Sequence, residues 1–309
     1  MLMVSFLLMR KIFQLFLILL LGFGIVRAGV LRASDSVILS RLSLYLISPC
    51  VIINAFQVEF TAGVRQGLVL ALVVSAAIYV LFLVLGAVLR RGLHMDAVEE
   101  ASVIYPNAAN LIIPLVSGVL GPEWVIYTSA FISVQLCCLW SHGRRLFTAD
   151  EPFELKKVVL NVNMLSIAAG ALLLVLGVRL PAVLRETVTA VGDMIGPVSM
   201  LITGMLAAQM HPRRILANRR IWLVLSLRML LCPALVLLLL RIFQPGARVP
   251  DGNTVLLVTF LATATPAANT VTQFAQLYGH DAEYAGAINI LSTLLCLATM
   301  PLFVWLYGL

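Results

Sequence analysis

Two short stretches of this sequence, PNAAN at 106–110 and PAAN at 266–269, decide how the chain folds. Each lies inside an apolar run, and each is followed at nearly the same distance by a glycine, Gly121 or Gly279. A proline inside a helix removes a hydrogen bond and clashes with the preceding turn. In hydrocarbon the freed carbonyl groups need another partner. The two stretches therefore predict two broken helices that cross each other, with asparagine beside each break.

The rest of the chain has the composition of a membrane protein. Hydrophobic residues make up 61% and charged residues 11% of its 309 residues, whereas soluble domains are about 45–50% apolar and about 25% charged. Ten apolar runs are each close to the ~20 residues that a helix needs to cross a bilayer. They lie near 11–31, 36–56, 66–90, 98–119, 121–142, 157–177, 187–208, 220–242, 253–277 and 283–307. The sequence predicts an all-α polytopic membrane protein of ten transmembrane helices, in which the fourth and ninth are the broken ones.

The basic residues indicate how these helices are oriented. The net charge of +7 comes from pairs of Arg and Lys in the gaps between apolar runs, which is the positive-inside pattern rather than a nucleic-acid surface. In a ten-span topology, twelve of the 21 basic residues lie on one side and seven on the other. We therefore expect a multi-pass protein of the plasma membrane, the inner membrane of a bacterium, with both termini outside and no nucleic-acid partner.

The two breaks belong to an internal repeat. Pro49 in the second run and Pro197 in the seventh occupy corresponding places, as the two broken stretches do. We therefore predict two five-helix halves, 1–150 and 151–309. Because each half holds an odd number of spans, the halves have opposite orientations in the membrane.

The polar residues around the breaks are the predicted binding site. Asparagine offers both donors and acceptors, and the N-termini of broken helices favour negative charge near the midplane of the bilayer. Polar side chains at this density indicate water, an ion or a substrate. The alternative is that the prolines only kink the helices and the amides only bridge neighbours. The candidate substrate-binding residues are Asn107, Asn110, Asn269, Thr265, Gln273 and, from the fifth run, Gln135.

Two charged residues fall inside predicted helices. Arg228 is about eight residues into the eighth run, which at 1.5 Å per residue is roughly 12 Å deep. Its side chain is expected to extend back toward the membrane surface; the alternative is a cation that anchors an anionic substrate or pairs with Asp193. Asp193, in the seventh run, is the candidate proton carrier of a proton-coupled mechanism, because burial favours the neutral acid. A simple ion pair or a place in a water-filled vestibule is the alternative for Asp193.

The same stretches resemble a known family. Pro106-Asn107, with Pro114 eight residues after Pro106, is similar to the fourth-helix motif of the auxin efflux carriers, and the stretch from Pro266 to 302 resembles their ninth and tenth helices. The chain looks like a prokaryote-like member of this family, within the bile, arsenite and riboflavin transporter superfamily. The resemblance covers essentially the whole chain. Unlike plant auxin carriers, the chain has no long hydrophilic insert between its halves.

The resemblance implies two inverted five-helix repeats, divided into a scaffold of helices 1, 2, 6 and 7 and a transport part of helices 3–5 and 8–10. It implies secondary transport of a small organic anion by elevator-type alternating access, and a homodimer in the lipid bilayer. The family's substrates are mono- or dicarboxylates, malate-like, malonate-like or auxin-like. Pro106, Pro114 and Pro266 are then crossover prolines, with Asn107 and Asn269 beside them. The ninth run lacks the plant pattern after Pro266, which disfavours auxin itself.

Other classes of function have less support. The acidic pair Glu99-Glu100 lacks the partners that hydrolytic chemistry requires, and the sequence has no glycine-rich phosphate loop, so we expect no enzyme. The cysteines lie inside apolar runs without a CxxC pair, and the histidines have no partner at metal-ligand spacing, so we predict no metal site and no cofactor. An anion channel or a membrane sensor that uses the same crossover site is the alternative function.

Overall fold

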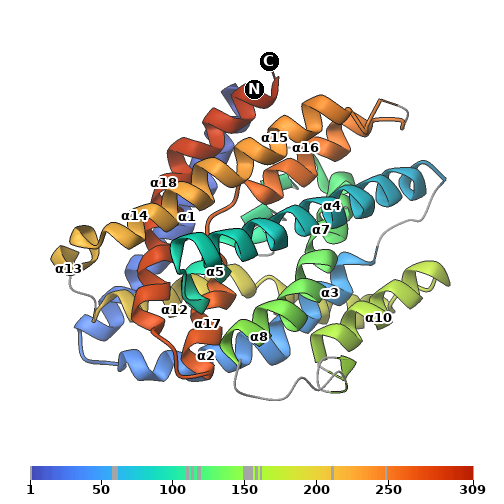
Figure 1. Cartoon of the computed structure of the whole chain (residues 1–309). Helices are drawn as coiled ribbons and strands as arrows, with labels where there is room; N and C mark the ends of the chain where they lie inside the picture. Colours follow the sequence, from blue (N-terminus) through green and yellow to red (C-terminus); the bar gives the residue numbers. More distant parts are fainter. Residues whose placement is uncertain are drawn as a thin grey trace.

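The computed structural model of the chain is helical throughout the part that it describes (Figure 1). It describes residues 2–308 except 58–61, 109–110, 113–114, 117–119, 149–155, 157–158, 161, 210–211 and 248. Within these ranges, β-type pairing is confined to one isolated bridge between Pro106 and Ala267. The all-α prediction is confirmed.

Helices occupy each apolar run of the first half. They are α1 (Leu2–Arg27), the 3-10 turn η1 (Ala33–Asp35), α2 (Ser36–Leu42), the π-helical turn η2 (Ser43–Ile47), α3 (Ser48–Ala55), α4 (Ala62–Leu93), α5 (Ala97–Ile104), the 3-10 turn η3 (Pro122–Trp124), α7 (Val125–Cys138), the π-helical turn η4 (Leu139–Gly143) and α8 (Arg144–Phe147). The π-helical turns continue the helices on either side of them, so that 33–55 and 125–147 are each one helix.

Helices also occupy the apolar runs of the second half. It contains α10 (Val162–Val175), α11 (Ala182–Gly192), α12 (Ile195–Ala207), α13 (Pro212–Ala217), α14 (Arg219–Ser226), the π-helical turn η5 (Leu227–Leu231), α15 (Cys232–Phe243), α16 (Gly252–Thr263), α17 (Asn269–Leu277) and α18 (Ala282–Gly308). As in the first half, the fourth apolar run is divided, here between α16 and α17.

Several of these helices are built to cross a membrane. In the described residues, five are long and apolar enough by themselves, and a sixth is if the bent helix α18 counts as one span. The five are Ala33–Ala55, Gly63–Leu93, Val125–Phe147, Ala182–Ala207 and Arg219–Phe243. On α4 the exposed stripe consists of valines at helical spacing, Val69, Val73, Val80, Val84 and Val88. A soluble protein would place polar residues there, so this stripe is a lipid-facing surface.

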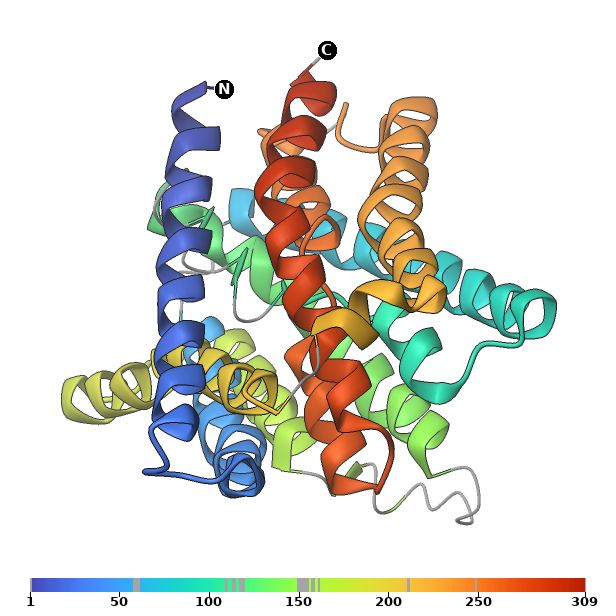
Figure 2. The same ribbon diagram turned by 90° about the vertical axis from the view of Figure 1, so that its left-hand side faces the viewer.

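Helices from the first and second halves of the chain pack on each other. α1 packs against α12, and α10, the first helix of the second half, packs against α3. Gly204 permits the first of these contacts, because a Cβ there would overlap the carbonyl of Leu19. Figure 2 shows α1 and α18 side by side, with both chain termini at the same end of the molecule.

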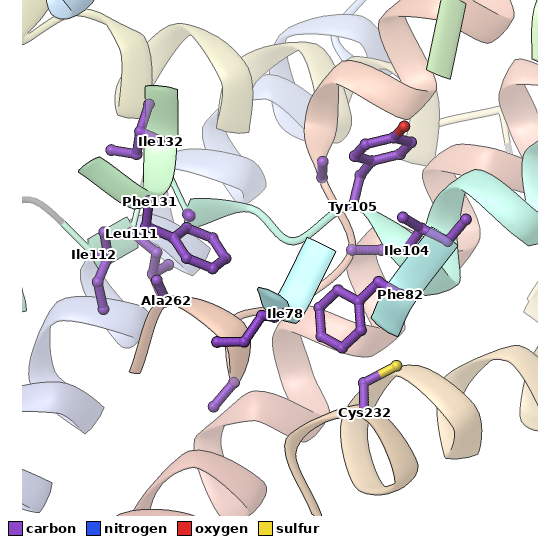
Figure 3. Close-up of a cluster of buried hydrophobic side chains, with 14 of the residues drawn as sticks. Ile78, Phe82, Ile104, Tyr105, Leu111, Ile112, Phe131, Ile132, Cys232 and Ala262 are labelled. Atoms are coloured by element: carbon purple, nitrogen blue, oxygen red, sulfur yellow. The ribbon is translucent and has the colours of Figure 1, made fainter. Parts of the chain in front are cut away.

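A buried apolar core holds the segment that follows α5. α4 packs against α5, α7 and α16, and the ring of Tyr79 on α4 lies 5.4 Å from that of Phe131 and 6.3 Å from that of Tyr105. Figure 3 shows part of this core, with Ile78, Phe82, Ile104, Tyr105, Leu111, Ile112, Phe131, Ile132, Cys232 and Ala262 labelled. Close packing of large side chains around Tyr105 fixes where the chain leaves α5.

Candidate functional site

Two helix interruptions lie in the interior of the molecule. α5 ends at Ile104, and the chain continues through Tyr105 in an extended conformation (φ −98°, ψ 111°) into Pro106. α16 ends at Thr263, and α17 begins after Ala268, which is also extended (φ −66°, ψ 134°). Proline has no N–H to donate, and the residue before it is disfavoured in the helical conformation. The local sequence therefore ends a helix at each place.

The two interrupted segments are hydrogen-bonded to each other. The N–H of Asn107 donates to the carbonyl of Pro266 (2.7 Å), and the N–H of Ala268 donates to the carbonyl of Tyr105 (2.9 Å). These bonds give the antiparallel bridge between the segments. They satisfy main-chain groups that the broken helices cannot, which an apolar surrounding requires.

Side chains from the next helix of each half bind the same segments. Gln135 on α7 donates from Nε2 to the carbonyl of Pro106 (2.6 Å). Asn289 on α18 donates from Nδ2 to the carbonyl of Ala267 (2.6 Å), and the N–H of Ala267 donates to Oγ of Ser292 (3.1 Å). An amide in each half thus supports the segment that precedes it in the chain.

Arg228 binds main-chain carbonyls at both helix interruptions. Its guanidinium is fully buried and donates to the carbonyls of Thr263 (2.5 Å), Thr265 (2.9 and 3.2 Å) and Val103 (3.2 Å). Its Cζ also lies 5.9 Å from the centre of the Phe82 ring. Thr263 and Val103 are at the C-terminal ends of α16 and α5, where carbonyls lack helical partners and the helix dipole is negative. Arg228 therefore neutralises two helix ends at once.

This geometry corrects the expectation for Arg228. The side chain does not extend toward the membrane surface, because its donors are bound to carbonyls in the interior. For the same reason its guanidinium is not directed at Asp193 and is not a ready anchor for a substrate.

A small cavity lies beside the paired segments. Its volume is about 40 Å³, which is room for two or three water molecules at roughly 10–15 Å³ each. The lining is formed by Ser43, Leu44, Ser48, Val51, Ile52, Pro106, Asn107, Ile132, Gln135, Leu136, Leu139, Ile195, Ser199, Ala268, Thr270 and Gln273. None of these described lining residues is charged, and seven carry a hydroxyl or an amide.

The sequence profile of the family described as membrane transport protein matches residues 7–158 and also residues 151–304. The chain belongs to this family. The resemblance to the auxin efflux carriers is thereby confirmed, and the protein is a multi-pass membrane transporter. No curated protein matches the chain.

In this transporter the cavity brings together three of the predicted substrate residues, Asn107, Gln135 and Gln273. Thr265 and Asn269 are buried close by but do not belong to the described lining. The hydroxyl of Thr265 donates back to its own helix end, and its carbonyl binds Arg228. Thr265 therefore contributes to the structure around the cavity, whereas Asn269 Nδ2 is buried without a hydrogen-bond partner among the described residues, and Asn269 stays a predicted substrate residue.

The crossover prolines, Asn110 and Asp193 are the other predicted site residues. Pro106 lines the cavity and Pro266 pairs with Asn107, whereas Asn110 and Pro114 lie outside the described residues. Asp193 is exposed at the C-terminal cap of α11. Asp193 lies within the span Ala182–Ala207, as predicted, but its side chain is exposed rather than buried, and its role as a proton carrier stays a prediction.

Three serines of the wall were not predicted. Ser43 and Ser48 come from η2 and α3, and Ser199 comes from α12. A single hydroxyl in an apolar run is usually interhelical packing, so composition gives no warning of such a site. The prolines of these runs could have indicated the site. Pro49 directly follows Ser48, and Pro197 lies two residues before Ser199.

The cavity wall offers polar atoms to a guest. Within the described part of the chain, Gln135 Oε1 and Ser199 Oγ are buried without a hydrogen-bond partner, and Gln273 Nε2 reaches Ser43 Oγ only at 3.5 Å. Buried polar groups normally have partners, so such atoms point to a ligand or water. The first turn of α17 adds the partial positive charge of a helix N-terminus beside Ala268 and Thr270.

Proposed function

We propose that this transporter is a secondary carrier of a small organic anion, a mono- or dicarboxylate such as malonate or malate or an auxin-like acid, and not an enzyme. The observation that carries the proposal is the uncharged polar cavity at the paired helix interruptions. Asn107, Gln135 and Gln273 would bind the carboxylate through their amides.

The electrostatics of the site favour an anion over a cation. No acidic side chain is present among the described lining residues. The N-terminus of α17 supplies partial positive charge at one edge. The cationic Arg228 cancels the negative C-terminal ends of α5 and α16, so those ends do not repel an anion.

The architecture that we propose is ten spans in two inverted five-helix repeats, 1–150 and 151–309, with crossed, broken fourth and ninth helices. Three observations support it. Helices occupy the apolar runs of both halves, the first helix of each half packs on the second span of the other, and the two interruptions are paired. An even number of spans also agrees with termini at one end of the molecule (Figure 2). By the positive-inside pattern these termini lie outside a bacterial inner membrane.

The position of the cavity supports an elevator-type movement. Its wall comes partly from η2, α3 and α12, which belong to the proposed scaffold, and partly from 106–107, α7, η4 and α17, which belong to the proposed transport part. A cavity of about 40 Å³ is too small for a dicarboxylate, so loading requires the two parts to move relative to each other. The scaffold of helices 1, 2, 6 and 7 is then the part that remains fixed in the bilayer, as a homodimer.

Counterflow in liposomes tests this function. The purified protein is reconstituted with unlabelled malonate, malate or indole-3-acetate inside, and uptake of the same labelled acid is followed. We expect saturable counterflow for at least one acid, and its loss in Asn107→Ala. The matched control is Asn253→Ala, an exposed asparagine on α16, which should behave as the wild type. A channel would conduct without counterflow, and absence of any flux would remove the proposal.

A further inference from the structure

Two adjacent glutamates of α5 are both buried but are paired very differently. Glu99 accepts from Arg220 at 2.5 and 2.9 Å and from the hydroxyl of Tyr284 at 2.9 Å. The side chain of Glu100 is 2% exposed, and its cation, Arg90, is half exposed and 3.4 Å away. Charge-assisted hydrogen bonds are usually about 2.7–2.9 Å long. Glu100 is therefore a buried carboxylate with a weak counter-charge, which is costly while it stays ionised.

His142, in the π-helical turn η4, faces the other oxygen of Glu100. Its Nε2 lies 3.9 Å from Glu100 Oε1, and its Nδ1 lies 3.0 Å from the hydroxyl oxygen of Tyr105. That hydroxyl donates its hydrogen to the carbonyl of Cys138 (3.0 Å), so Nδ1–H is the donor toward Tyr105. In the neutral ring, Nε2 then presents a lone pair to the carboxylate. Two acceptors that face each other in this way form a site for one proton.

The pair lies between the surface and the crossing of the chain. The His142 side chain is 34% exposed and that of Arg90 is 50% exposed, so protons reach the pair from solvent. On the inner side, the carbonyl of Tyr105 accepts the N–H of Ala268 (2.9 Å). Gly143 leaves room for the Tyr105 ring, since a Cβ there would be 3.0 Å from Cε2. A change at His142 is therefore transmitted through one residue to the paired segments.

The neighbouring elements supply few other groups that compete for this proton. α5 packs against α4, α8, α14, η5, α17 and α18, and η4 packs against α7 and α8. The other ionisable groups on or next to them are Arg65, Tyr79, Arg90, Arg91, His94, Asp96, Glu99, Tyr127, Cys137, Cys138, Arg144, Arg145, Arg219, Arg220, Arg228, Cys232, Tyr278, Asp281, Glu283, Tyr284, Cys296 and Tyr307. Arg220 and Tyr284 bind Glu99, and Arg144 donates to the hydroxyl of Tyr278 at 3.1 Å. Besides Glu99, the acids among them are Asp96, Asp281 and Glu283, and these three are exposed.

We propose that Glu100 and His142 together bind the proton that drives anion transport, with Tyr105 linking them to the paired segments. This inference rests on the proposed function. One proton enters from the exposed side of His142, is held between Nε2 and Oε1, and leaves on the other side of the membrane. Glu100, His142 and Asn107 all belong to the proposed transport part, so proton and carboxylate move in the same direction as a symport.

The test separates exchange of the anion from its coupling to protons. Labelled malonate, or whichever acid shows counterflow, is offered to liposomes with an acidic exterior and the membrane potential clamped at zero. One coupled proton supports about tenfold accumulation for each pH unit of gradient. In the wild type we expect this accumulation. In Glu100→Gln, which keeps size and polarity but does not ionise, we expect counterflow to remain and accumulation to disappear. Glu283→Gln, which makes the same change at an exposed acid of α18, is the matched control and should accumulate as the wild type does.

Each outcome has one meaning. Gradient-driven accumulation in Glu100→Gln would overturn the proposal of a proton site. A wild type that exchanges the acid without responding to the gradient would also overturn it. In both cases the proposed function as an anion carrier stands. If Glu100→Gln also loses counterflow, His142→Asn is tested in its place, and we expect it to keep counterflow and lose accumulation. Tyr105→Phe is expected to weaken coupling. Loss of counterflow in both Glu100→Gln and His142→Asn would show a structural role and overturn the proposal. A wild type without counterflow for any acid would remove the proposed function and this inference with it.

Discussion

Replacing Arg228 by methionine tests whether a fixed cation holds the two helix ends together. The substitution preserves much of the side-chain volume but leaves the carbonyls of Thr263, Thr265 and Val103 without the donors that now bind them. An unsatisfied buried polar group costs about 1–3 kcal/mol, and breaking a buried charged contact costs about 3–5 kcal/mol in all. We expect Arg228→Met to destabilise the protein by about 3–5 kcal/mol, because local relaxation recovers part of the larger sum.

The assay is thermal unfolding of the purified protein in detergent. A loss of this size lowers the melting temperature on the order of 5–15 °C. Arg228→Lys should recover part of it, since one ammonium group lacks the planar fork that reaches carbonyls on two segments. Arg219→Met is the matched control, because Arg219 is exposed on α14 at the start of the same span. If Arg228→Met melted like the wild type, the carbonyl cluster would not depend on the guanidinium and this account of the interruptions would be wrong.

Four further predictions follow from the packing and the site. Gln135→Leu should cut the rate of counterflow at least about tenfold, since it removes the donor to the Pro106 carbonyl and an acceptor in the cavity; an unchanged rate would exclude Gln135 from the site. Asn269→Ala should reduce counterflow less than Asn107→Ala does, as the Asn269 side chain contacts Thr203 at 3.4 Å instead of the cavity, and equal losses would contradict this order. Gly204→Leu should lower the melting temperature by separating α1 from α12, whereas normal melting would show that this contact is not close. An epitope tag at either terminus should be reached by antibody in intact cells, and protection of both tags would reverse the proposed orientation.

Part of the site could be predicted because proline chemistry is local. Pro106 and Pro266 lack the N–H that a helix needs, and asparagines beside two matching prolines indicate a polar centre. Asn107, Gln135 and Gln273 were predicted as substrate residues around this centre, and all three line the cavity. Ser43, Ser48 and Ser199 could not be found, because a hydroxyl in an apolar run is equally compatible with packing until the facing helix is known.

The surroundings of the charged residues were the part of the structure that the sequence predicted least well. Helical periodicity gives the face on which a side chain lies but does not say whether that face meets lipid, water or another helix. Depth along the eighth run therefore did not reveal that Arg228 meets the carbonyl ends of α5 and α16. Position within an apolar run also did not show that Asp193 is exposed, whereas Glu99 and Glu100 are buried.

The sequence by itself determined that this chain is a helical membrane protein and indicated its transporter family, because composition and short motifs act over a few residues. Only the tertiary structure decided that the interruptions pair, that Arg228 binds their carbonyls, and that Glu100 faces His142. Those contacts join residues far apart in the chain, and the free energy that selects them comes from satisfying buried polar groups against one another where water is absent.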